Sequence, residues 1–237
     1  MENIEKSKIS RDAVLELLVV ILLGVTALLT AWASWIGSLH GGNQSTNYTQ
    51  SNNFASEGNS EYNAGIQSLM TDMMLYNEIN NLMIDLHFAE NRGDDEEADK
   101  IQWKIDELIA GNMSEEFSAA FDWAMEETEA RGESVSPFEM EGFSESYFNA
   151  ANDLLAQSEE ALEQGKKDNS NGDAFGLVTV VYSVVLFLLG ITGTFKSAKN
   201  KTALVAISAL AFIVITVYMF TIPMPTDFSI MNFFSGK

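Results

Sequence analysis

Three long apolar runs interrupt an otherwise polar sequence. They cover residues 17–37, 174–195 and 203–222, and none of them contains a charged residue. A helix needs about 20 apolar residues to cross a bilayer, so each run predicts a transmembrane helix, one near the N-terminus and a pair near the C-terminus. Pro223 and Pro225 end the third helix, because proline cannot continue the hydrogen-bond ladder.

Helical periodicity, and no convincing strand alternation, fills the region between the first and second runs. Apolar residues recur at helical spacing in four patterns over residues 66–173, which predicts an antiparallel helical bundle or a pair of helical hairpins. Asp94 or Asp95 and Ser114 suit the N-caps of the second and third helices, and a single fourth helix is expected to begin at Phe143. The stretch 168–173 favours a flexible hinge. The fold class predicted is an all-α integral membrane protein with an inserted helical-bundle domain.

Two features of the pattern leave alternatives open. Residues 38–65 are polar and aliphatic-poor, and form either a linker or a helical extension of the first span; the absence of proline favours the helix, whereas Gly41-Gly42 weakens it. The methionines of the first bundle helix either fill the core, which is the commoner role, or form an adaptable docking face. They are Met70, Met73, Met74 and Met83.

Charge is strongly segregated along the chain. Residues 38–173 hold 29 of the 34 acidic and 6 of the 13 basic residues, a net charge of −23, whereas the rest holds 5 acidic and 7 basic residues. A domain this acidic repels phosphate, so nucleic acid is not an expected partner. The chain has no cysteine and two histidines, which excludes disulfides and thiolate metal sites and argues against any cofactor.

The basic residues predict an orientation. Lys6, Lys8 and Arg11 precede the first span, and three lysines lie in residues 196–202. By the positive-inside rule, residues 1–16 and the loop 196–202 are cytoplasmic in the cell (inner or plasma) membrane. Residues 38–173, which include the helical domain 66–173, and an interfacial tail, 223–237, are then extracytoplasmic. Although 31–33 fits a signal-cleavage site, an apolar stretch exceeding 20 residues indicates an uncleaved anchor.

Two features of the first span are candidate functional positions. Thr26, Thr30, Ser34 and Ser38 recur every fourth residue, and such a face either packs against another helix, the favoured interpretation, or lines a pore in a ring of subunits. Glu16 lies at the edge of the span, where it reaches the cytoplasmic interface or, inside a bundle, becomes an intramembrane acid. His40 is a candidate pH-sensitive group just beyond the span.

These observations favour a non-enzymatic role. The sequence contains no evident nucleophile–base pair or metal-ligand set, so the preferred hypothesis is a membrane accessory, scaffold or sensor subunit. Its extracytoplasmic domain would bind further copies or other membrane-protein subunits. The alternative is a homo-oligomeric cation channel in which the first span lines the pore and the acidic domains concentrate cations.

Overall fold

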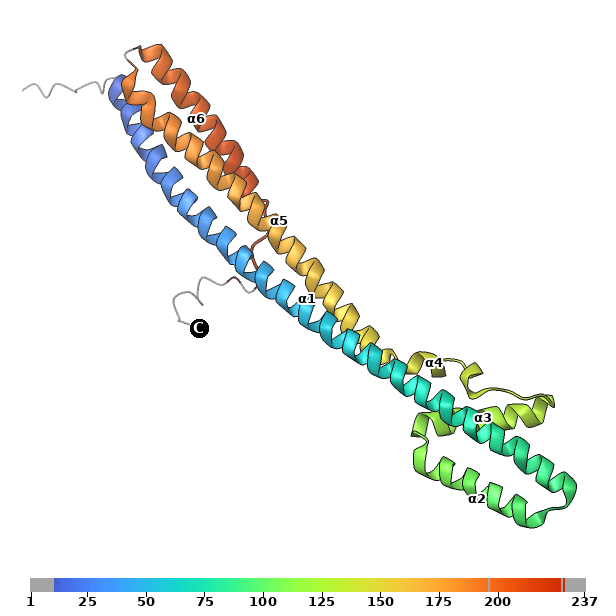
Figure 1. The fold of residues 1–237 in the computed structure, drawn as a ribbon. Helices are drawn as coiled ribbons and strands as arrows, with labels where there is room; N and C mark the ends of the chain where they lie inside the picture. Colours follow the sequence, from blue (N-terminus) through green and yellow to red (C-terminus); the bar gives the residue numbers. More distant parts are fainter. Residues whose placement is uncertain (1–10, 196, 227, 229–237) are drawn as a thin grey trace, which may run out of the picture. The chain divides into compact units, whose positions relative to one another are not determined.

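The computed structural model describes residues 11–195, 197–226 and 228, which form helices and turns with no β-strand among them (Figure 1). Three helices are long and apolar enough to cross a membrane: α1 (Arg11–Arg92), α5 (Asn149–Ile191) and α6 (Ala198–Met219). The prediction of an all-helical chain with three such helices is thus confirmed. The shorter elements are α2 (Asp95–Asn112), α3 (Glu115–Arg131), η1 (Pro137–Glu139), α4 (Phe143–Ser146) and η2 (Thr192–Thr194).

Helix α1 continues for 82 residues, through the polar stretch 38–65. The chain has no proline before Pro137, so nothing in this stretch removes a backbone donor from the helix. The helix ends at Arg92 because Gly93 adopts a left-handed conformation with φ of 70°. The predicted N-caps follow: the Asp94 carboxylate accepts from the Glu97 N–H at 3.3 Å, and the Ser114 hydroxyl accepts from Phe117 at 3.0 Å.

Helix α5 corrects two predictions. The hinge expected at 168–173 does not form, because α5 continues through these residues, with Asp168 buried and bonded to α1. The single helix expected from Phe143 is interrupted between Ser146 and Asn149. At this break the Tyr147 carbonyl comes so close to α1 that a Cβ on Gly65 would lie 2.3 Å from its oxygen.

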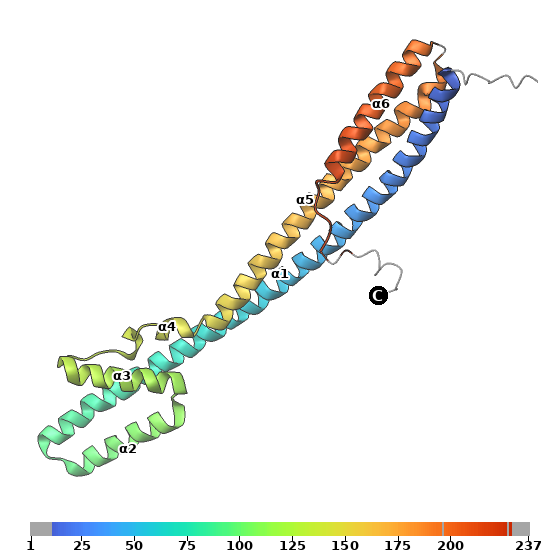
Figure 2. The ribbon, with the colours of Figure 1, turned by 180° about the vertical axis from the view of Figure 1, so that it is seen from behind.

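The chain divides into two compact units, Met1–Ser51 with Glu160–Lys237 (unit 1) and Asn52–Glu159 (unit 2). Helices α1 and α5 pass from one unit into the other, so the division falls inside helices and not at the edges of residues 66–173. Within unit 1, α1, α5 and α6 lie side by side (Figures 1 and 2). Their buried core includes Ile36, Phe175, Tyr182 and Met219.

Unit 2 has its own core. The distal part of α1 packs against α2, α3 and the η1–α4 segment through Leu75, Ile79, Ile105, Phe117 and Phe143, all buried. Phe117 stacks against the ring of Phe143, with centroids 6.1 Å apart. These contacts fix one face of α1 toward the core and leave the opposite face outward.

Candidate functional site

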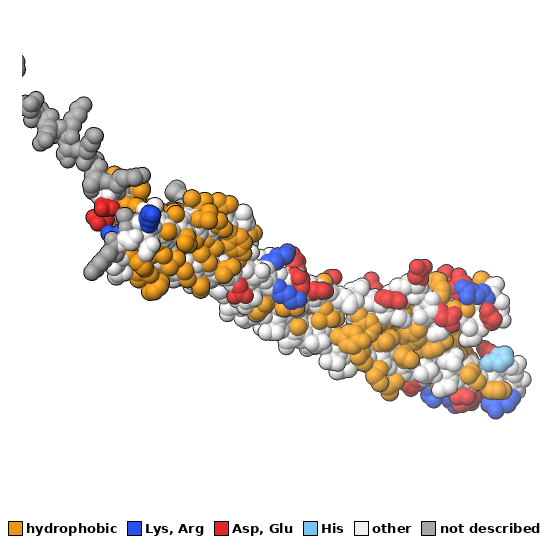
Figure 3. Space-filling model, turned by 90° about the horizontal axis from the view of Figure 1, so that it is seen from above, with side chains coloured by type: hydrophobic (Ala, Val, Ile, Leu, Met, Phe, Trp, Pro, Cys, Tyr) orange, Lys and Arg blue, Asp and Glu red, His pale blue; other side chains and the backbone are white. Residues whose placement is uncertain are grey.

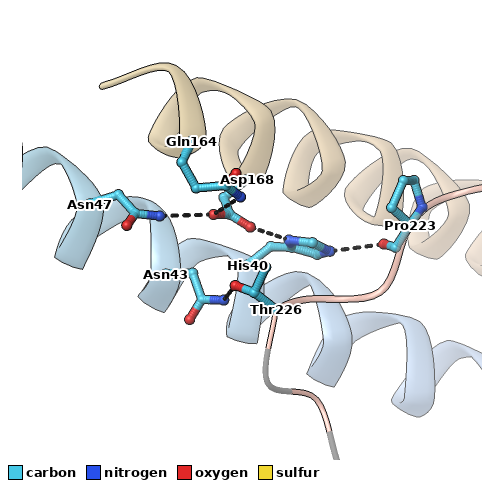
Figure 4. Close-up of polar contacts among 7 residues, drawn as sticks. All are labelled: His40, Asn43, Asn47, Gln164, Asp168, Pro223 and Thr226. Carbon is cyan, nitrogen blue, oxygen red and sulfur yellow. Dashed lines mark hydrogen bonds and ion pairs between the residues drawn. The ribbon is translucent and has the colours of Figure 1, made fainter. Parts of the chain in front are cut away.

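A buried polar cluster in unit 1 joins α1 to α5. His40 of α1 and Asp168 of α5 are each 1 % exposed, and His40 Nδ1 lies 2.8 Å from Asp168 Oδ1 (Figure 4). The other ring nitrogen, Nε2, lies 3.1 Å from the carbonyl oxygen of Pro223, in the segment that follows α6. One imidazole therefore connects three parts of unit 1 that are far apart in the sequence.

The partners of His40 define where its protons lie. A backbone carbonyl only accepts, so Nε2 carries a hydrogen that it donates to Pro223. A further proton lies between Nδ1 and the Asp168 carboxyl group. With either group as the donor, this hydrogen bond satisfies two polar side chains that are both buried.

The second oxygen of Asp168 is also occupied. Asn47 of α1 and Gln164 of α5 both direct their amide nitrogens to Oδ2, at 3.0 and 3.2 Å (Figure 4). An amide nitrogen is a hydrogen-bond donor, so both side chains donate to the carboxylate. With these two bonds, each oxygen of the buried Asp168 carboxyl group has a partner. The cluster is consequently satisfied within unit 1, and neither nitrogen of His40 is left to act on a substrate.

Small residues allow the two helices to approach at this level. A Cβ on Gly37 would lie 3.2 Å from the Cβ of Phe175, and one on Gly172 would lie 3.6 Å from the Gly37 carbonyl oxygen. The imidazole of His40 stacks on the Phe175 ring, with centroids 5.9 Å apart. Glycine thus brings the backbones close enough for a short side chain such as Asp168 to reach across.

The segment after α6 is attached to α1 at three places. Besides the Pro223 carbonyl, Thr226 accepts a hydrogen bond from Asn43 at 3.3 Å, and Phe228 packs edge-on against Trp32 and Trp35. The sequence predicts an interfacial tail over 223–237. Pro223, Thr226 and Phe228 contact α1, and residues 227 and 229–237 of that prediction lie outside the described residues.

The four residues of the predicted hydroxyl stripe lie in different environments. Thr26 is fully buried, Thr30 is half-buried and donates to the Thr26 carbonyl at 2.7 Å, and Ser34 and Ser38 are exposed. A step of four residues overshoots one helical turn by about 40°, so the stripe drifts around α1 as it rises. Only Thr26, at the N-terminal end of the stripe, is fully buried.

Glu16 lies at the rim of a cavity of about 350 Å³ in unit 1. The cavity is lined by α1 near Leu15 and Glu16, by α5 and η2 at Gly190 and Gly193, and by Lys201 of α6. Glu16 itself is exposed. The acid and the predicted basic loop therefore share one end of unit 1.

A second buried carboxylate belongs to unit 2. The Tyr147 hydroxyl donates to Asp72 Oδ2 at 2.6 Å, beside a cleft of about 830 Å³ whose rim includes Glu61 and Glu116. Burial, and then the hydrogen bond to Asp72, raise the pKa of Tyr147 well above its ordinary value. This phenol therefore stays protonated and anchors the break between α4 and α5 to α1. No three acidic or histidine side chains among the described residues are grouped to hold a metal ion.

Large apolar side chains are exposed on unit 2. Met70, Met73 and Met74, for which core filling is the commoner role, point outward, and Met74 is 70 % exposed. Ile84 and Phe88 lie further along the same helix and are also exposed. Figure 3 shows hydrophobic side chains gathered on unit 2, bordered by acidic ones, in addition to those that cover unit 1.

The sequence singled out His40 but did not pair it with Asp168, which is 128 residues away. A signal was available: His40 lies three residues after the first predicted span and Asp168 six residues before the second. Helices that enter the same membrane face side by side bring such positions to one level. Comparison with known proteins adds no relative, since no protein-family model, curated sequence or solved structure matches this chain.

Proposed function

We infer that this protein is a membrane-anchored assembly subunit, in which unit 1 holds the chain in the bilayer and unit 2 binds a protein partner outside the cytoplasm. Three helices capable of crossing a membrane support the anchoring role. The cluster of His40 and Asp168 also supports the anchoring role. Its polar groups bond to one another and thereby hold α1, α5 and the segment after α6 together.

The observation that carries the proposal is the exposed apolar face of α1 in unit 2. Soluble surfaces seldom expose several large apolar side chains along one helix, and such patches mark sites of interaction. Met70, Met74 and Phe88 are each more than half exposed, at 57, 70 and 58 %. They lie outside the apolar run of α1 that is suited to a bilayer, so contact with lipid does not account for them.

The orientation completes the proposal. Positive charge on the N-terminal residues and around Lys199 and Lys201 supports a cytoplasmic location for these segments. With three spans, unit 2 is then extracytoplasmic, together with the segment that follows α6. A partner would meet a surface in which an apolar, uncharged helix face is surrounded by acidic residues.

Blue native electrophoresis of gently solubilised membranes tests this role. The wild type should migrate as an assembly, and the double variant Met74→Glu/Phe88→Glu should migrate as a monomer, because buried carboxylates in an interface cannot be solvated. Met125→Glu, at an exposed methionine of α3, is the matched control and should migrate as the wild type does. A monomeric wild type, or an assembly unaffected by the double variant, would overturn the proposal.

A further inference from the structure

The exposed face of α1 in unit 2 has the spacing of a coiled-coil seam. Six exposed positions follow one another at intervals of alternately four and three residues, and they are uncharged: Met70, Met74, Asn77, Asn81, Ile84 and Phe88. We call these six residues the α1 strip. Apolar positions repeating every 3.5 residues are the pattern by which two helices pack knobs into holes.

The α1 strip lies directly opposite the core of unit 2. Ile79, fully buried, faces the core, and a rotation of about 100° per residue places each strip position within roughly 40° of the opposite direction. The core face packs against α2 and α3, so these two helices lie on the side of α1 away from the strip. The strip is free to meet another helix along its whole length.

We propose that the α1 strip binds the same strip of a second copy of this chain, forming a parallel two-stranded coiled coil. This inference rests on the proposed function and names its partner. Two copies inserted in one membrane with the same orientation present α1 in the same direction, as a parallel pair requires. The strip is also compatible with its own copy, since it has no charge to bury.

Flanking charges distinguish the parallel pair from the antiparallel one. With Asn77 at position d and Asn81 at position a, Glu78 and Asp85 occupy e positions, while Met73, Asn80 and His87 occupy g positions. In a parallel pair each e residue faces a g residue of the other helix, so both acids face neutral side chains, Met73 and Asn80. An antiparallel pair would place e against e, with acid facing acid.

Of the two asparagines at the centre of the strip, Asn81 at its a position fits the same arrangement. An asparagine at an a position of a parallel pair fixes register and favours two strands, at a cost in stability. Asn77 and Asn81 interrupt an otherwise apolar seam between Met74 and Ile84. Met70 and Met74, with flexible thioether side chains, can adapt to each other across the pair.

Single-cysteine crosslinking in native membranes tests this pairing directly, because the chain has no cysteine of its own. Met74→Cys, Asn77→Cys, Asn81→Cys, Ile84→Cys and Phe88→Cys should each form a disulfide-linked dimer on oxidation. Asp99→Cys on α2 and Asp122→Cys on α3, both exposed, are the controls and should stay monomeric. Crosslinks at both ends of the strip identify a parallel, in-register pair, since an antiparallel pair juxtaposes like positions only near its middle.

A second set of variants separates contact from chance collision. Ile84→Cys/Met74→Glu should lose the dimer, whereas Ile84→Cys/Met125→Glu should keep it. Dimers confined to the central positions would overturn the parallel arrangement, and no dimer at any strip position would overturn pairing with a second copy. If the wild type still migrates as an assembly in that last case, the proposed function survives with a different partner; if it is monomeric, both fail.

Discussion

His40 and Asp168 are the residues on which the coherence of unit 1 most depends. Each is buried, and together with Asn47, Gln164 and the Pro223 carbonyl they form a closed set of donors and acceptors. Removing one member of a buried polar pair is costly, because the remaining group has lost its partner but not its burial. The cluster therefore makes the packing of α1 against α5 dependent on the identity of two side chains.

We expect His40→Leu alone and Asp168→Leu alone each to lower the free energy of unfolding by about 3–5 kcal/mol. The double variant His40→Leu/Asp168→Leu should lose less than either single variant, since replacing a whole buried pair with apolar side chains is often nearly neutral. Denaturant titration in mild detergent measures all three. Additive losses in the double variant would show that the two side chains are not coupled.

Tyr147 should make the stability of unit 2 decrease at alkaline pH. Its pKa is raised in the folded chain by burial and by the bond to Asp72, so the folded state holds the phenolic proton more tightly than the unfolded state does. The stabilisation is complete below about pH 10, the ordinary tyrosine pKa, and declines as pH rises above it. Unfolding titrations should therefore show the wild type losing more stability than Tyr147→Phe between neutral and strongly alkaline pH. Parallel losses in the two proteins would contradict this role.

At the scale of elements, glycines in α1 serve opposite purposes. Gly65 is required, because a Cβ there would lie 2.3 Å from the Tyr147 carbonyl oxygen, whereas a Cβ on Gly42 would meet nothing within 4 Å. Gly42→Ala should stabilise the helix by about 0.5–1 kcal/mol. Gly65→Ala should instead destabilise unit 2, since backbone must move to admit the methyl group. Thermal unfolding followed by circular dichroism compares the two, and equal effects would count against the close approach of α1 to Tyr147.

Elements defined by local signals were predictable from the sequence. The end of α1 at Arg92-Gly93 and the caps Asp94 and Ser114 depend on residues within a few positions of one another. The prediction of a hinge at 168–173 was wrong. A polar segment that contains glycine usually forms a loop, but it can stay helical where a neighbouring helix supplies hydrogen-bond partners for its polar side chains. Here α1 supplies that neighbour, through His40 and Asn47.

The face that α1 exposes in unit 2 was harder to predict for a different reason. Leu69, Met70 and Met73 lie on a helix that is apolar on both sides, and periodicity does not say which side faces the core when two stripes overlap. Only the packing of Ile79 and Leu75 against α2 and α3 decides it, and these contacts span tens of residues. Once Ile79 and Leu75 face the core, the residues of the α1 strip are left exposed.

At the scale of the whole molecule, the orientation proposed for the chain has a direct test. Because the sequence has no cysteine, Asp99→Cys and Lys199→Cys each report the side of the membrane on which α2 and the start of α6 lie. A membrane-impermeant maleimide added to intact cells should label Asp99→Cys at once, and Lys199→Cys only after permeabilisation. The reverse pattern would place unit 2 in the cytoplasm.

The central claim is that this chain exists in its membrane as an assembly held through unit 2. Native mass spectrometry of the protein, extracted gently from its own membrane, measures the composition of that assembly. The account predicts a complex that contains at least two copies of the 26.1 kDa chain and that dissociates in the Met74→Glu/Phe88→Glu variant. A wild-type protein recovered only as a single chain would contradict it.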